Sequence, residues 1–186
     1  MSTRLVTLLI VAVAALVVGA CGNKEEETLH ADTEGIYVDV GGLKYQVQIS
    51  RVLNPTDRED RDYLVDLGAG EQLAADENWF AVFMRVENDG DKAAPATDGY
   101  SIKDTQGNEY KPVVMGPKNV FAYRPAVLQP EDILPLPSSA AAEGTIQGSM
   151  LLFKIPVANF QNRPLELEIP PPEGAEGGTG TVDLDV

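Results

Sequence analysis

The stretch Trp79-Phe80-Ala81-Val82-Phe83-Met84-Arg85-Val86-Glu87-Asn88 decides the fold class of this chain. Its even-numbered positions from 80 to 86 are all apolar, and so are positions 79, 81 and 83, so that only Arg85 and Glu87 make the second face polar. A period of two is typical of a β-strand, and apolar residues on both faces are typical of a strand in the middle of a sheet. The turn residues of Asn88-Asp89-Gly90-Asp91 follow directly. We therefore predict a central strand over 79–88.

Further strands are predicted on both sides of this stretch. The alternating or apolar segments, some of them paired across a turn, are 36–40, 43–50, 100–103 with 109–111, 145–155 and 165–169. The alternation slips at Arg51-Val52-Leu53, which marks a bulge or the end of a strand. The 13 prolines and the lack of helical periodicity over three turns exclude a helical bundle. The predicted fold is all-β, an immunoglobulin-like antiparallel β-sandwich.

The length and charge of the chain limit its function. With 186 residues the chain has room for one well-buried domain, and two would be crowded. It carries 14 Lys and Arg against 29 Asp and Glu, a net charge of −15. So acidic a surface repels phosphate backbones, which excludes a nucleic-acid partner.

The first 21 residues have the pattern of an export signal. Met1-Ser2-Thr3-Arg4 precedes an apolar run from Leu5 to Val18, which is too short to span a bilayer comfortably and suits a cleaved signal peptide. Gly19-Ala20-Cys21 follows, and Cys21 is the only cysteine. This junction resembles the lipobox of bacterial lipoproteins, a resemblance that implies acylation of Cys21 and cleavage before it; an uncleaved helical anchor is the alternative. We expect a signal peptide over 1–20, then the lipidated cysteine and a flexible acidic tether over 21–35, on the extracytoplasmic face of the cell membrane.

The strand patterns also resemble a family of bacterial extracellular domains related to a mycobacterial secreted immunogenic antigen. The resemblance runs from about Gly42 to Ile169 and is carried by 80–88, by 100–104 with Gly107 and Tyr110, by 148–156 and by 165–167. Members of that family are immunoglobulin-like sandwiches, often on lipoproteins, without established catalytic residues. The resemblance implies a sandwich over 36–170, and the chain departs from it by a long segment over 54–78. A Pro- and Gly-rich tail follows over 171–186, in which Val182, Leu184 and Val186 form a possible terminal edge strand.

Few residue types with catalytic chemistry are available. The only histidine, His30, falls in the expected tether, and Cys21 is expected to be acylated. This excludes Cys–His and Ser–His–Asp catalysis and a zinc site of the usual His or Cys ligands, so no metal site or cofactor is predicted. Hydrolysis of envelope glycans by two carboxylic acids remains as an alternative. We predict that the chain is not an enzyme.

Two loops are the candidate binding regions. The acidic segment 54–78 has clustered carboxylates of the kind that calcium prefers, but lacks the regular calcium-loop spacing. The segment 116–125 has two alternate aromatic residues beside a guanidinium, which form either a partner-binding surface or an edge strand. The candidate residues are Asp57, Asp60, Asp62, Tyr63, Phe121, Tyr123 and Arg124. The sequence thus predicts a lipid-anchored module that binds an envelope protein or glycan, with a calcium-stabilised adhesion-type module as a second alternative.

Overall fold

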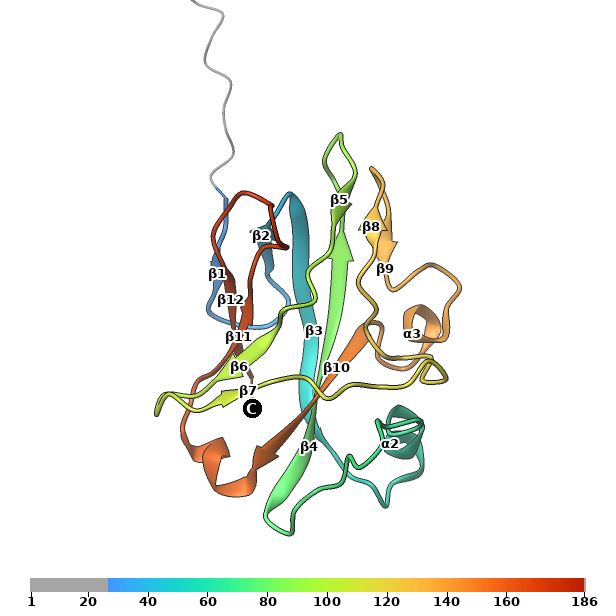
Figure 1. The fold of residues 1–186 in the computed structure, drawn as a ribbon, viewed down its shortest axis with the longest axis vertical. Coiled ribbons are helices and arrows are strands. Elements are labelled where there is room, and N and C mark those ends of the chain that lie inside the picture. The colour runs from blue at the N-terminus through green and yellow to red at the C-terminus, as the bar shows by residue number, and fades with distance from the viewer. Residues whose placement is uncertain (1–26, 186) are drawn as a thin grey trace, which may run out of the picture.

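The computed structural model describes residues 27–185, and Figure 1 shows two β-sheets packed against each other. The predicted signal peptide over 1–20 and Cys21 lie outside the described residues. The first sheet, here the β11 sheet, has the order β1(His30–Ala31), β12(Gly180–Leu184), β11(Leu165–Ile169), β6(Ser101–Lys103), β7(Glu109–Tyr110). The second, here the β4 sheet, has the order β10(Ser149–Pro156), β4(Glu77–Glu87), β3(Leu43–Leu53), β2(Tyr37–Val40), with β9(Ile133–Leu134) also paired to β4. A small pair consists of β5(Ala94–Pro95) and β8(Val127–Leu128).

All strand pairs named here are antiparallel except β1 with β12. The predicted all-β antiparallel sandwich is therefore confirmed. Helices are short: α2(Arg58–Tyr63), α3(Ala140–Glu143) and the 3-10 helix η1(Val157–Gln161). Among residues 27–185, no helix has the length and apolar content needed to cross a membrane.

The prediction that β4 is a central strand is confirmed, because β4 pairs with β3 on one side and with β10 on the other. Its even-numbered residues from 80 to 86 lie in the apolar cluster between the two sheets, here the inner cluster. Trp79, Ala81 and Phe83 lie in a second apolar cluster on the opposite face, here the outer cluster. The outer cluster also includes Tyr63 and Met115, which belong to no strand. The β4 sheet thus has a layer of helix and loop on the face away from the β11 sheet.

The sandwich is longer at both ends than the sequence predicted. The predicted tether over 21–35 contains β1, in which His30 and Ala31 pair with Thr181 and Val182. The predicted tail contains β12, which is not an edge strand but lies between β1 and β11. A two-residue strand is too short to show periodicity, so no sign of β1 is visible in the sequence. Its partner β12 follows a Gly-rich linker, so the sequence did not show that β12 pairs inside the sheet. The predicted limits of 36–170 are corrected accordingly.

The register of β3 differs from the predicted alternation. The pairing with β4 shifts between Val47 and Ile49, which is a β-bulge earlier than the predicted slip at 51–53. A bulge inserts one residue and so exchanges the two faces beyond it. As a result Ile49 is 39% exposed, whereas Ser50 is 5% exposed. The strand then continues to Leu53, which packs in the outer cluster.

The predicted hairpin between β6 and β7 is confirmed and is organised by Asp104. The carboxylate accepts hydrogen bonds from Gln106 N, from Asn108 N and Nδ2, from Tyr110 Oη and from Asn162 Nδ2. Burial alone would raise the pKa of Asp104, but these hydrogen bonds outweigh it and lower the pKa far below the ordinary 3.8. The ionised Asp104 carboxylate therefore fixes the turn between β6 and β7.

Candidate functional site

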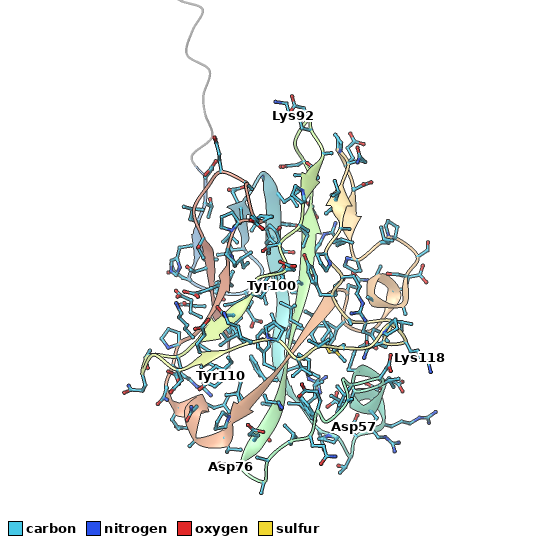
Figure 2. All side chains as sticks on the ribbon, in the orientation of Figure 1. Asp57, Asp76, Lys92, Tyr100, Tyr110 and Lys118 are labelled. Atoms are coloured by element: carbon cyan, nitrogen blue, oxygen red, sulfur yellow. The ribbon has the colours of Figure 1, made fainter. Side chains whose placement is uncertain are left out.

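The segment 54–78 begins with a short helix that Asp57 caps. The Asp57 carboxylate accepts hydrogen bonds from Glu59 N at 2.9 Å and Asp60 N at 3.2 Å, two of the amides that a helix leaves unpaired at its start. These amide hydrogen bonds lower the pKa of Asp57. Asp57 was predicted as a binding residue, and the structure places it at the helix start, where Figure 2 labels it.

Asp60 lies on the buried side of α2, and its carboxylate is already hydrogen-bonded within the protein. Arg51 Nη2 lies 2.7 Å and 2.8 Å from its two carboxylate oxygens, and Asn54 N donates to it at 2.7 Å. The Asp60 side chain is 2% exposed. A carboxylate engaged in this way fixes α2 to β3 and is not open to a partner. Asp62, two residues further along α2, is exposed.

Tyr63 turns inward from the end of α2. It is 6% exposed, and its ring meets Phe83 of β4 at 5.1 Å and Phe121 at 4.8 Å, both in edge-to-face geometry. Two of the residues predicted as separate binding elements, Tyr63 and Phe121, are therefore in direct contact. The sequence did not show this, because the two residues are far apart in the chain.

Asn119 holds the two predicted loops together. Its Nδ2 donates to the carbonyls of Tyr63 and Val65, both at 2.8 Å, and its Oδ1 accepts from the amides of Phe121 and Ala122, both at 3.0 Å. The Asn119 side chain thereby uses both of its donor protons and both acceptor positions. Asn119 is 4% exposed, so none of these four hydrogen bonds competes freely with water.

Further contacts extend this junction along both segments. Gly116 N donates to Asp66 O at 2.7 Å, Lys118 N donates to the Asp66 carboxylate at 2.8 Å, and Gly68 N donates to Val114 O at 3.1 Å. A Cβ at position 116 would lie 2.2 Å from Asp66 Oδ2, so the close approach requires glycine there. We call residues 54–78 and 113–125 together the joined loops. Figure 2 shows Asp57 and Lys118 on the side of the molecule that carries α2.

Tyr123 and Arg124 lie at the end of the joined loops beside a pocket of about 220 Å³. Tyr123 is 8% exposed and its hydroxyl donates to Thr97 O at 2.9 Å. The exposed Arg124 donates through its guanidinium to the carbonyls of Met115 and Gly116. Of the predicted aromatics, then, Tyr63 and Tyr123 pack into the fold, which leaves no flat exposed ring for a sugar to stack on at these two positions.

The surface of the joined loops carries residues that the sequence analysis missed. Val65, Val114 and Val120 are 47%, 77% and 61% exposed. Charged side chains accompany them, among them the exposed Asp62 and Lys118. Exposed apolar side chains with charged side chains nearby are a common composition of protein-binding surfaces. Val65 and Val120 are next in the chain to Asp66 and Asn119, which bond the two loops to each other, and the carbonyl of Val114 accepts from Gly68 N. The sequence did not show these residues because the bonds join segments that are far apart in the chain.

The carboxylates of 54–78 were considered as calcium ligands only as an alternative, and within the part of the chain that the structure describes no group of three of them has the spacing of metal ligands. Asp57 and Asp60 are occupied by helix capping and by Arg51, as described above. Among residues 27–185, the group with the spacing of metal ligands lies elsewhere and consists of His30, Glu166 and Asp183.

Comparison with known proteins finds similar folds at low sequence identity. No family model matches this sequence, and no curated protein matches it either, so the resemblance to the mycobacterial antigen-like family stays a prediction. The yjhA protein of Bacillus subtilis is 13% identical over 83% of this chain and 99% of its own, with a TM-score of 0.47. An uncharacterised β-sandwich protein of Clostridium difficile is 11% identical over 87% of this chain and 98% of its own, with a TM-score of 0.45. The YcdA protein of Bacillus subtilis, described as a candidate lipoprotein, is 9% identical over 79% of this chain, which spans only 38% of its length, with a TM-score of 0.44.

Proposed function

We propose that this chain is a lipid-anchored, extracytoplasmic lipoprotein whose sandwich binds another protein of the cell envelope through the joined loops. The anchor is proposed on the sequence of residues 1–21, with Cys21 as the acylated residue. The binding surface is proposed on one observation: two loops far apart in the sequence are fixed into one unit by Asn119 and present exposed valines.

A fixed loop favours binding because little conformational entropy remains to be lost when a partner docks. The joined loops rest on the outer cluster through Tyr63 and Met115, so their backbone is supported from below. Three exposed valines with charged side chains nearby favour a protein partner, because apolar surface is what such a partner can bury. We propose no catalytic step at this surface.

The surface is tested by site-specific photocrosslinking of the full chain in its own envelope. A crosslinker at Val120 is expected to capture one defined protein. The matched control is Val127 of β8, which is also 61% exposed but lies outside the joined loops. Val120→Asp should abolish copurification of the captured protein, whereas Val127→Asp should leave it unchanged. Equal capture from both positions, or capture of no protein at Val120, would contradict the proposed surface.

The anchor is tested by mass spectrometry of the protein from the membrane fraction. We expect an N-terminus at Cys21 carrying acyl mass, and we expect Cys21→Ser to remove that mass and release the protein from the membrane. An intact start at Met1, or Cys21 without added mass, contradicts lipidation. Release of sugar from envelope glycans by the purified protein would instead support the hydrolase alternative.

A further inference from the structure

The outer face of the β11 sheet brings the only histidine of the chain next to two carboxylates. His30 comes from β1, Asp183 from β12 and Glu166 from β11, three strands that are neighbours in the sheet. One ring nitrogen of His30 and one oxygen of each carboxylate lie within 4.8 Å of one another. Figure 1 shows these three strands side by side at one edge of the sandwich. Because the sequence placed His30 in a tether, this arrangement was not predicted.

The carboxylates of Glu166 and Asp183 face each other, and no Lys or Arg side chain of the described residues forms an ion pair with either of them. Glu166 and Asp183 are directly opposite in the antiparallel register of β11 and β12, a position in which like charges are destabilising. Lys103 is opposite Glu166 on the other side and attracts it electrostatically, but its ammonium is bonded to Glu168 at 2.6 Å rather than to Glu166. Within residues 27–185, neither Glu166 nor Asp183 forms an ion pair. A cation placed between the pair would remove the repulsion.

The hydrogen bonds of His30 determine which nitrogen is available to such a cation. Nε2 lies 2.9 Å from Asp32 Oδ1, and an ionised carboxylate only accepts hydrogen bonds, so Nε2 carries the proton. In the neutral ring the Nδ1 lone pair then accepts from the hydroxyl of Thr181 at 2.8 Å. A cation at Nδ1 would replace this hydrogen bond, and the Thr181 hydroxyl can rotate away because its proton is not fixed in direction. A carboxylate that holds one nitrogen of a histidine while the other nitrogen faces a metal is the common outer support of histidine ligands.

We propose that His30, Glu166 and Asp183 bind a divalent transition-metal ion of the zinc type. An imidazole nitrogen with two carboxylate oxygens is a ligand set that Zn²⁺ accepts, with water in the fourth position, whereas Ca²⁺ uses oxygen ligands alone. The three ligands come from three strands, so the ion links β1 to β12 and β11. Since β1 has only two residues, this link holds the first strand of the sandwich to the sheet. The proposed site is separate from the joined loops and does not depend on their function.

The test is the melting temperature of the untagged full-length chain in detergent, with and without Zn²⁺, measured by circular dichroism. A polyhistidine tag is omitted and Cys21→Ser is present throughout, because both groups bind zinc. We expect zinc at a hundredfold excess over the dissociation constant to raise the melting temperature by several degrees. His30→Ala should remove this rise, and so should Glu166→Gln combined with Asp183→Asn. Asp32→Asn, which leaves all three ligands in place, should weaken zinc binding by about 10- to 100-fold.

The matched control is Glu109→Gln, the same acid-to-amide change on β7 of the same sheet, which should keep the full rise with zinc. Co²⁺ provides a readout that does not depend on stability, because its visible absorption bands require coordination and should vanish in His30→Ala. An equal rise with zinc in the Cys21→Ser chain with and without His30→Ala would overturn the proposal. So would an equal rise with Ca²⁺ that persists in His30→Ala, since the carboxylates alone would then be the site.

Discussion

The two faces of β4 are both buried, but they are covered in different ways. The inner face packs against a second sheet, whose strands other than the two-residue β1 are recognisable in the sequence. The outer face packs against α2 and the joined loops, whose cover depends on Asn119 and on a few aromatic contacts. A strand pattern therefore predicts that a face is buried without predicting what buries it.

The largest test of this difference compares Phe80→Ala on the inner face with Phe83→Ala on the outer face. Both rings are 0% exposed, so each truncation should lower the free energy of unfolding by about 3–5 kcal/mol, measured by urea denaturation. Hydrogen exchange should separate them. Phe83 contacts Tyr63, so its loss should speed exchange in the joined loops, whereas Phe80→Ala should not single out that region. Identical exchange patterns would show that the two layers unfold as one unit.

The sequence predicted the inner half of this comparison well. The two-sided apolar pattern of 79–88, the hairpin of β6 with β7 and the alternation of β11 each depend on neighbouring residues, which a local pattern can show. The bulge at Val47–Ile49, the short β1 and the contact of Tyr63 with Phe121 depend on pairings between distant segments. The sequence predicted 54–78 and 116–125 as the candidate binding loops, which stays a prediction, and it did not show that Asp60 is bound by Arg51.

The next effect comes from pH and concerns the inner cluster. Burial raises the pKa of Tyr45 to about 12, and it also raises the pKa values of Tyr100 and Tyr123. The neutral phenol is thus favoured in the folded state, while the unfolded chain ionises at the ordinary value of 10.0. Stability should be fully present below pH 10 and should fall as the pH rises through 12, with Tyr45 alone accounting for on the order of 2 kcal/mol.

Thermal melts between pH 8 and pH 12 measure this fall. Tyr45→Phe should flatten it, although the variant starts from a lower value because Thr97 N loses its acceptor. Tyr37 is the control: burial and Glu87 also raise its pKa, but it is only partly buried and lies outside the inner cluster, so Tyr37→Phe should leave most of the alkaline fall in place. If the melting temperature of Tyr45→Phe fell with pH as steeply as that of wild type, ionisation of Tyr45 would not be what destabilises the folded state.

A smaller effect is expected from Asn119→Ala in the outer layer. The change removes four hydrogen bonds and leaves the buried carbonyl of Tyr63 without its donor, which should lower the free energy of unfolding by about 1–3 kcal/mol. Exchange should quicken in 63–68 and 116–122 while β11 and β12 stay protected. Asn54→Ala, which removes an exposed contact with Thr56, is the control. If the joined loops remain as protected in Asn119→Ala as in wild type, the apolar contacts and not the asparagine hold them.

The smallest expected effect is that of Asp57→Ala at the start of α2. The lost cap should lower the melting temperature by no more than a few degrees, because α2 is held to β4 mainly by Tyr63 and to β3 by Asp60. The amides of Asp60 and Glu59 lower the pKa of Asp57 from the ordinary 3.8, so its contribution is present above pH 4 and is lost as the pH falls further. The difference between wild type and variant should therefore close in acid. Asp62→Ala on the same helix should show no such convergence. If Asp57→Ala instead released the whole outer layer, the cap rather than the packing of Tyr63 would be what attaches that layer to the sandwich.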